Sequence, residues 1–270
     1  MRLPLKLAAA AAAIALAFPM AAQAHRAWML PSATVLSGKD VWVTVDAAIS
    51  NDLFFFEHHP MRLEGLVVSA PDGTPAKAEN QATGRYRSTF DVKLDQTGTY
   101  KLAVVNAGLF ASWKENGQNK RWRGTADKFA TEVPKDAQEL RVTQSQSRME
   151  VFVTSGKPTE GVLKPTGEGL ELAPVTHPND LSVGNEAKFR FLLDGKPAPG
   201  VKVTVIRGGI RYRDKLEELT LTTGADGGFA VTWKEPGMYW IEASARDDKT
   251  AIKEAKERRA GYSTTLEVLP

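Results

Sequence analysis

The sequence of 270 residues contains no cysteine, and this absence excludes several kinds of chemistry. Without thiols the chain can form no disulfide, hold no metal through thiolate and use no cysteine nucleophile. The stability of the folded chain must therefore come from packed apolar cores.

The chain also has a small net charge and few long apolar runs. The chain has 35 Lys and Arg residues against 32 Asp and Glu residues, so its formal net charge is only +3. This balance argues against nucleic acid as a partner, because nucleic-acid-binding surfaces are strongly basic. Beyond residue 24, no apolar run approaches the ~18 residues that a membrane-spanning helix needs.

Residues 1–24 have the three parts of a secretory signal peptide. Arg2 and Lys6 give a positive start, an apolar run extends from Leu7 to Phe18, and Ala22-Gln23-Ala24 matches a cleavage site. Removal of this segment would leave 33 basic against 32 acidic residues. We therefore expect a periplasmic protein whose mature chain begins at His25.

A histidine at a new N-terminus can offer a metal two nitrogens, its free α-amine and a ring nitrogen. Copper(II) and nickel(II) favour tetragonal nitrogen sites, so either ion suits His25. The competing interpretation is that cleavage must leave some residue at the terminus, and that a lone histidine there has no function.

Alternating apolar residues dominate the rest of the chain and predict strands. In the first half Phe90 precedes Tyr100 by ten residues, and in the second half Phe229 precedes Tyr239 by ten. This weak repeat, with frequent turn residues and no helical crossovers, predicts an all-β fold. We expect two tandem antiparallel β-sandwich domains of the immunoglobulin-like or transthyretin-like type.

Composition suggests where the two domains meet. Residues 156–169 are rich in Gly, Pro and Thr and are expected to link an N-terminal sandwich with a metal site (25–155) to a C-terminal sandwich (170–270). Periodicity disappears over residues 106–134, which are expected to form a long loop. A short helix is expected over residues 136–146.

The chain has only four histidines, and none lies inside a clear strand pattern. His25, His58, His59 and His177 are therefore candidate metal ligands. If residues 54–59 are extended, the two adjacent rings face opposite sides and only one meets a given metal. The structural alternative is a loop that packs these imidazoles against phenylalanine rings.

Two candidate ligands, Glu57 and His177, also have other possible roles. Glu57 could supply an oxygen to the metal or to its surroundings. His177 lies in a Thr-His-Pro-Asn turn signal, for which a purely structural role is the commoner explanation. No catalytic residue is assigned, because the chain contains no Gly-x-Ser-x-Gly, phosphate-loop or His-Glu-x-x-His motif.

Three motifs carry a resemblance to a known family: His25-x-x-Trp28-x-Leu30-Pro31, Phe55-Phe56-Glu57-His58-His59-Pro60 and Gly195-Lys196-Pro197-x-Pro199-Gly200-Val201. Together they resemble a bacterial secreted domain family that is associated with nickel uptake and is otherwise of unknown function. The last motif is also similar to transthyretin-like and carboxypeptidase regulatory-like domains.

This resemblance implies a periplasmic protein that binds copper or nickel, as an ion or a chelate, for uptake or handling of the metal. The implied partner is an inner-membrane transporter or an outer-membrane receptor. His25 is also similar to the histidine brace of periplasmic copper carriers and of lytic polysaccharide monooxygenases. The alternatives are therefore a copper-dependent oxidase, with residues 106–134 as its substrate platform, and an envelope interaction module that binds no metal.

Overall fold

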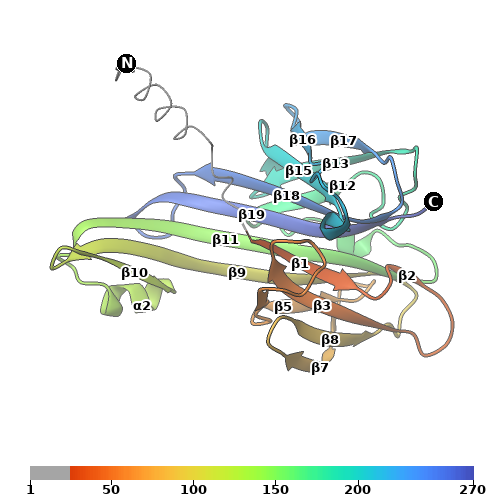
Figure 1. The fold of residues 1–270 in the computed structure, drawn as a ribbon, viewed down its shortest axis with the longest axis horizontal. Coiled ribbons are helices and arrows are strands. Elements are labelled where there is room, and N and C mark those ends of the chain that lie inside the picture. The colour runs from red at the N-terminus through yellow and green to blue at the C-terminus, as the bar shows by residue number, and fades with distance from the viewer. Residues whose placement is uncertain (1–24) are drawn as a thin grey trace, which may run out of the picture.

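The computed structural model describes residues 25–270, and strands make up most of this range (Figure 1). The predicted signal peptide, residues 1–24, lies outside the described residues. Within the described range no helix is long and apolar enough to cross a membrane. The all-β prediction is confirmed.

The first sandwich pairs a five-stranded antiparallel sheet with part of a larger central sheet. The smaller sheet has the order β1-β3-β8-β7, and β4 adds to β3. Its strands are β1 (Arg26–Pro31), β3 (Trp42–Ser50), β4 (His59–Pro60), β7 (Ala78–Thr83) and β8 (Ser88–Lys93). Alternate residues of β3 and β8, such as Val43, Val45, Phe90 and Val92, are buried, because one face of each strand lies on the core.

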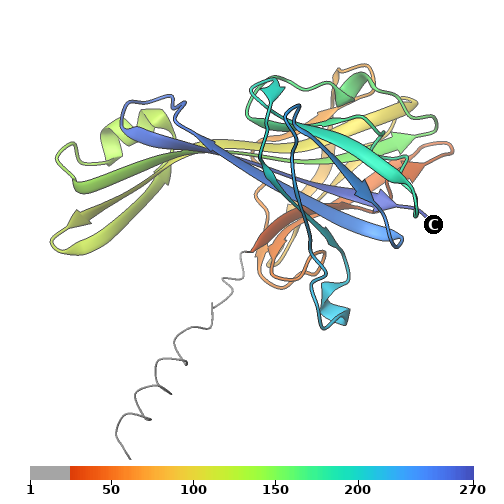
Figure 2. The same cartoon turned by 90° about the horizontal axis from the view of Figure 1, so that it is seen from above.

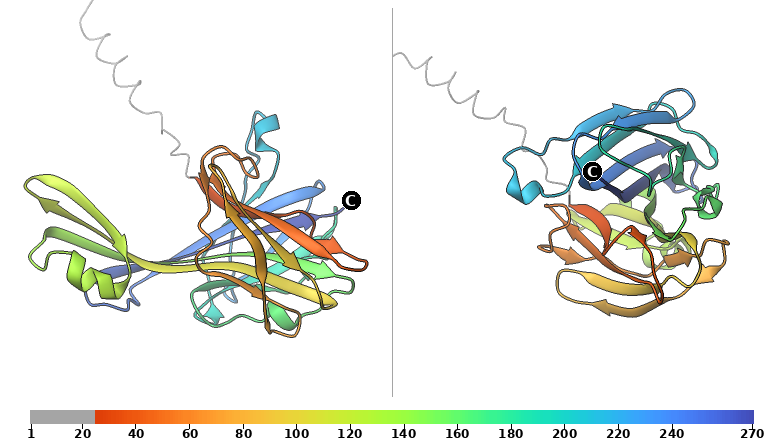
Figure 3. Two further views of the ribbon diagram at one scale, coloured as in Figure 1. Left: turned by 90° about the horizontal axis from the view of Figure 1, so that it is seen from below. Right: turned by 90° about the vertical axis from the view of Figure 1, so that its right-hand side faces the viewer.

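The second sandwich is built in the same way. A four-stranded sheet contains β12 (Leu170–Pro174), β13 (Glu186–Leu193), β14 (Lys196–Pro197) and β17 (Gly228–Thr232). It packs on the other part of the central sheet through a core that includes Phe189, Phe191, Val203, Ile241 and Tyr262. The end-on view in Figure 3 shows the two sandwiches one above the other.

One ten-stranded sheet runs through both sandwiches, in the order β16-β15-β18-β19-β11-β9-β5-β6, with β10 beside β9 and β2 beside β11. Its strands are β2 (Val35–Leu36), β5 (Leu66–Ser69), β6 (Pro75–Ala76), β9 (Gly98–Glu115), β10 (Gln118–Gly124), β11 (Gln138–Ser155), β15 (Lys202–Arg207), β16 (Leu219–Thr222), β18 (Gly237–Asp247) and β19 (Ala255–Val268). The halves join where β11 pairs with β19 in parallel. The chain passes between the sandwiches through residues 156–169, which include the short helix η1 (Gly161–Leu163).

The expected loop over residues 106–134 is wrong. These residues complete β9, form β10 and add the helix α2 (Ala126–Glu132), and together with the start of β11 and the β18–β19 connection they form an arm that projects from the sandwiches (Figure 2). The helix expected over residues 136–146 is wrong as well, because β11 begins at Gln138. A small core made of Leu109, Ala111, Phe129, Val133, Val142 and Ala255 stabilises the arm. The proposed oxidase therefore loses the irregular loop that was expected to serve as its substrate platform.

Candidate functional site

Strand pairing brings two of the candidate histidines to one end of the first sandwich. Ile49 of β3 pairs with Ala27 of β1 on one side and with His59 of β4 on the other. His25 precedes β1 directly, so it lies at the same end of the sheet. The contact between distant parts of the sequence thus follows from the backbone pairing itself.

The three imidazole rings form a continuous row. The ring centroids of His25 and His58 are 3.7 Å apart, and those of His58 and His59 are 4.1 Å apart. His25 and His59 are exposed, whereas His58 is half-buried between them. The expectation that only one of the adjacent pair meets a given metal depended on an extended chain over residues 54–59. That premise is wrong, because residues 51–58 form turns and bends, with Phe54 in the left-handed region at φ 63°. How many of the two rings meet one metal stays a prediction.

Glu57 closes the loop that carries the histidines. Its Oε1 accepts hydrogen bonds from the backbone N–H groups of Asn51 and Asp52, each at 2.9 Å. Such a carboxylate satisfies two loop donors that would otherwise need water. Glu57, which immediately precedes His58 in the chain, therefore contacts the loop backbone.

A cluster of aromatic rings anchors the loop from below. The buried Trp28 contacts Phe54 and Phe56, each with a centroid separation of 5.5 Å, and its Nε1 donates to Ser50 Oγ at 2.8 Å. Trp240 in the second sandwich donates from Nε1 to Ala27 O at 3.0 Å. Aromatic contacts of this kind fix relative positions as well as burying apolar area.

The second sandwich also contacts the loop through its connection between β15 and β16, residues 208–218, which includes the short helix η2 (Ile210–Tyr212). The guanidinium of Arg211 lies 4.0 Å from the centroid of Phe55. A Cβ added to Gly208 would lie 2.7 Å from the Phe54 ring. The position of the histidines therefore depends on packing against both sandwiches.

The electrostatic environment favours a neutral imidazole at the centre of the row. Partial burial lowers the pKa of His58, and the neighbouring charges of His25 and His59 lower it further, while Glu57 opposes them. A metal ligand must be an unprotonated imidazole, so a lowered pKa reduces competition from protons. Partial burial, together with the adjacent histidines, thus favours the form of His58 that can bind a metal.

The rings do not yet converge on one point. Across residues 25–270, no three His, Asp or Glu side chains have the arrangement that a metal ion needs. The rings of the histidine row lie against one another, so metal ligation requires side-chain rotation. His25 and His59 are exposed and can rotate about their side-chain torsions without displacing the core.

His177 lies apart from this row. Its Nε2 is 3.1 Å from Thr99 Oγ1 and 3.2 Å from Thr159 O, and its Nδ1 accepts from the Asn179 N–H at 3.1 Å. Thr99 of β9 pairs with Thr154 of β11, which also pairs with β2. Strand β1 starts next to His25 and runs towards this end of the sandwich, so His177 and His25 lie at different ends. Both ring nitrogens of His177 thus serve contacts at the junction of the sandwiches, and the structure does not bring this histidine to the others.

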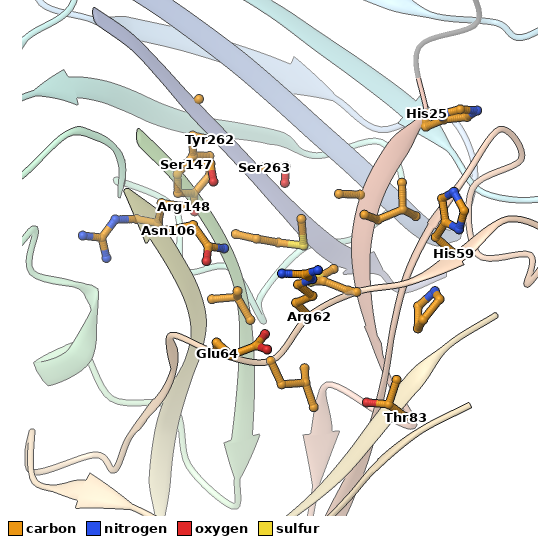
Figure 4. Close-up of a pocket in the computed structure, with 18 of the residues that line it drawn as sticks. His25, His59, Arg62, Glu64, Thr83, Asn106, Ser147, Arg148, Tyr262 and Ser263 are labelled. Atoms are coloured by element: carbon orange, nitrogen blue, oxygen red, sulfur yellow. The ribbon is translucent and has the colours of Figure 1, made fainter. Parts of the chain in front are cut away.

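An open cleft of about 1210 Å³ lies beside the histidines (Figure 4). His25 and His59 line one side, and Asn106 and Tyr262 of the central sheet line another. Arg62 lies between these walls in Figure 4. Sequence reasoning missed this cleft because its lining comes from nine strands, β1, β3, β4, β7, β9, β10, β11, β18 and β19. The recognised motifs supply only the side that contains His25 and His59.

A comparison with known protein families shows which family the chain belongs to. The family described as "Domain of unknown function (DUF4198)" matches residues 22–247, which include the histidine row, both sheets of the first sandwich and most of the second. The chain belongs to the DUF4198 family. The family description assigns no activity to its members, and no curated protein matches the chain.

Solved structures resemble this DUF4198 chain only distantly. The D0-D1 domain of Intimin is 14% identical, with 90% of this chain and 97% of that chain covered and a TM-score of 0.23. Escherichia coli alpha-2-macroglobulin activated by porcine elastase is 14% identical, with 92% and 20% covered and a TM-score of 0.25. Dimeric latent PorU from Porphyromonas gingivalis is 10% identical, with 94% and 21% covered and a TM-score of 0.22. The chain spans about a fifth of the latter two, and these scores are too low to support any argument about function.

Proposed function

We propose that this DUF4198 protein is a periplasmic protein that binds copper or nickel through His25, His58 and His59 and serves uptake or handling of the metal. The observation that carries the proposal is the row of three imidazole rings at one end of the first sandwich. Folding joins a predicted N-terminal residue to a loop that is distant in sequence.

Export would complete the set of ligands. Cleavage after Ala24 would free the α-amine of His25, which together with its own imidazole can chelate one ion. His58 and His59 would add further imidazole nitrogens from the facing loop. A set of amine and imidazole nitrogens suits copper(II) and nickel(II), and by the general order of affinities copper binds more tightly than nickel.

The biological role follows from the sequence resemblance. The motifs at residues 25–31 and 55–60 are similar to those of nickel-uptake-associated domains, and the second half is similar to transthyretin-like domains. A protein that collects a metal in the periplasm must pass it on or receive it. The partner is then an inner-membrane transporter or an outer-membrane receptor.

The test compares two forms of the purified protein by calorimetric titration with copper(II) and nickel(II). One form begins at His25 with a free α-amine, and in the other form the same α-amine is acetylated. We expect acetylation to weaken binding at least ~10-fold, because the acetylated nitrogen no longer offers a lone pair to the metal and the amine–imidazole chelate is lost. Equal affinity of the two forms would refute the chelate, and no binding by either form would refute the proposed function.

A further inference from the structure

The cleft beside the histidine row is far larger than a metal ion requires. Its volume of about 1210 Å³ lies above the ~300–1,000 Å³ that is usual for small-molecule sites. Apolar side chains, including Ile49, Met61, Leu63 and Met149, form part of its surface. A bare ion would leave most of this space to water.

Two arginines in the cleft have no acidic partner among residues 25–270. Arg62 follows β4 in the chain, and Arg123 lies on β10, where its guanidinium sits 4.9 Å from the centroid of Phe110. In the range that the structure describes, neither forms an ion pair. Arg148 in the same cleft differs, because it is held by Glu150 at 3.3 Å and by Glu171 at 3.7 Å.

Carboxylates share the cleft with these cations. Glu64 follows Arg62 by two residues, and Glu242 projects from β18 into the same space. A plain anion would meet repulsion from both glutamates, whereas a bare cation would meet repulsion from both arginines. The mixed lining suits a ligand that carries a metal cation and anionic groups together.

We infer that the cleft binds the metal as a complex with a small organic polycarboxylate. Arg62 and Arg123 pair with carboxylates of the chelator, because guanidinium groups match carboxylates in shape and charge. His25 and His59, on the same cleft, ligate the open side of the ion. This inference rests on the proposed function and names the chemical class of its ligand.

Citrate is a suitable probe, because its one-to-one complex with nickel(II) leaves coordination positions on the ion and a carboxylate unused. The experiment is equilibrium dialysis of the protein beginning at His25 with radiolabelled nickel and radiolabelled citrate, alone and together. The expected result is retention of both labels in equal amounts from the mixture, and little retention of citrate without nickel.

Variants separate this inference from the proposed function. We expect Arg62→Gln and Arg123→Gln each to weaken citrate retention ~10- to 100-fold, as for loss of a charged hydrogen bond, while bare nickel is retained as before. Arg121→Gln is the matched control, because Arg121 is exposed on the same strand as Arg123 but does not line the cleft.

If the unmodified protein retains nickel but no citrate from the mixture, binding of a metal–polycarboxylate complex is refuted and the proposed function stays intact. The same holds if Arg62→Gln and Arg123→Gln retain citrate as well as Arg121→Gln does. Failure to retain nickel in either form would overturn both proposals.

Discussion

The substitution Gly208→Ala lies in the second sandwich and should disturb the histidine row of the first. The new Cβ would lie 2.7 Å from Cδ2 and 3.0 Å from Cε2 of Phe54, and 3.2 Å from Met238 O. Carbon atoms pack best at ~3.5–4.0 Å, so the Phe54 ring must withdraw by several tenths of an ångström or more. The backbone of Gly208 does not have a positive φ, so the conflict is with its neighbours and not with its own conformation.

The size of the effect follows from overpacking. An additional methyl group in a well-packed region costs ~1–3 kcal/mol, so the free energy of unfolding should fall by that amount. Phe54 lies four residues before His58 and contacts Trp28, so its movement should shift the loop that carries the rings. We expect copper affinity to fall ~10-fold, since ~1.4 kcal/mol corresponds to a factor of ten.

Gly224→Ala is the matched control. Gly224 also lies in the second sandwich and lacks a positive φ, but an added Cβ would approach no atom closer than 3.5 Å. Urea unfolding would measure stability, and calorimetric titration with copper would measure affinity. If Gly208→Ala binds copper as tightly as Gly224→Ala does, the second sandwich does not hold the histidine loop and this reasoning is wrong.

The remaining predictions concern other parts of the molecule. Replacing His177 by Gln should leave copper affinity within ~2-fold, as measured by the same titration, but should lower stability by ~1–3 kcal/mol, because its ring nitrogens join Thr99 and Asn179 at the junction of the sandwiches. Hydrogen bonds from Arg258 lower the pKa values of Asp194 and Asp247 below their usual 3.8, so their contribution to stability should be complete above about pH 4 and disappear as the pH falls through the lowered values. Arg258→Gln should therefore destabilise the protein more at pH 7 than at acid pH, and an equal loss at both pH values in urea unfolding would contradict the linkage.

The strands of the two cores could be predicted because one face of each is buried. Val43 and Val45 in β3, and Phe90 and Val92 in β8, alternate with less buried residues, and this period is visible in the sequence. Such local patterns identify the class of fold. They do not identify which strands pair, and the parallel pairing of β11 with β19 joins segments more than a hundred residues apart.

The arm could not be predicted for a related reason. Most of β10 and the first part of β11 are exposed, and the alternation in β10 is only between exposed and half-buried residues. Its side chains are mostly polar on both faces, so hydrophobicity in the sequence does not show this period. Trp113 and Trp122 only partly pack against the small core around Phe129. A strand without a buried face looks like a loop in the sequence.

The candidate site, too, could be predicted only in part from the sequence. The chemistry of His25, His58 and His59 could be proposed from residue type and from the predicted cleavage site. Their meeting depends on the pairing of β1, β3 and β4 and on the turn at Phe54, which no periodicity shows. Arg123 was missed entirely, because it reaches the cleft from an arm that the sequence did not predict.

The most direct test of metal binding by the histidine row is pulsed electron paramagnetic resonance of the copper(II)-loaded protein that begins at His25. The account predicts nitrogen couplings from more than one imidazole. Replacing both His58 and His59 by Gln should reduce these couplings to those of the His25 ring, whereas His177→Gln should leave them unchanged. An unaltered spectrum of the double variant would contradict the shared site.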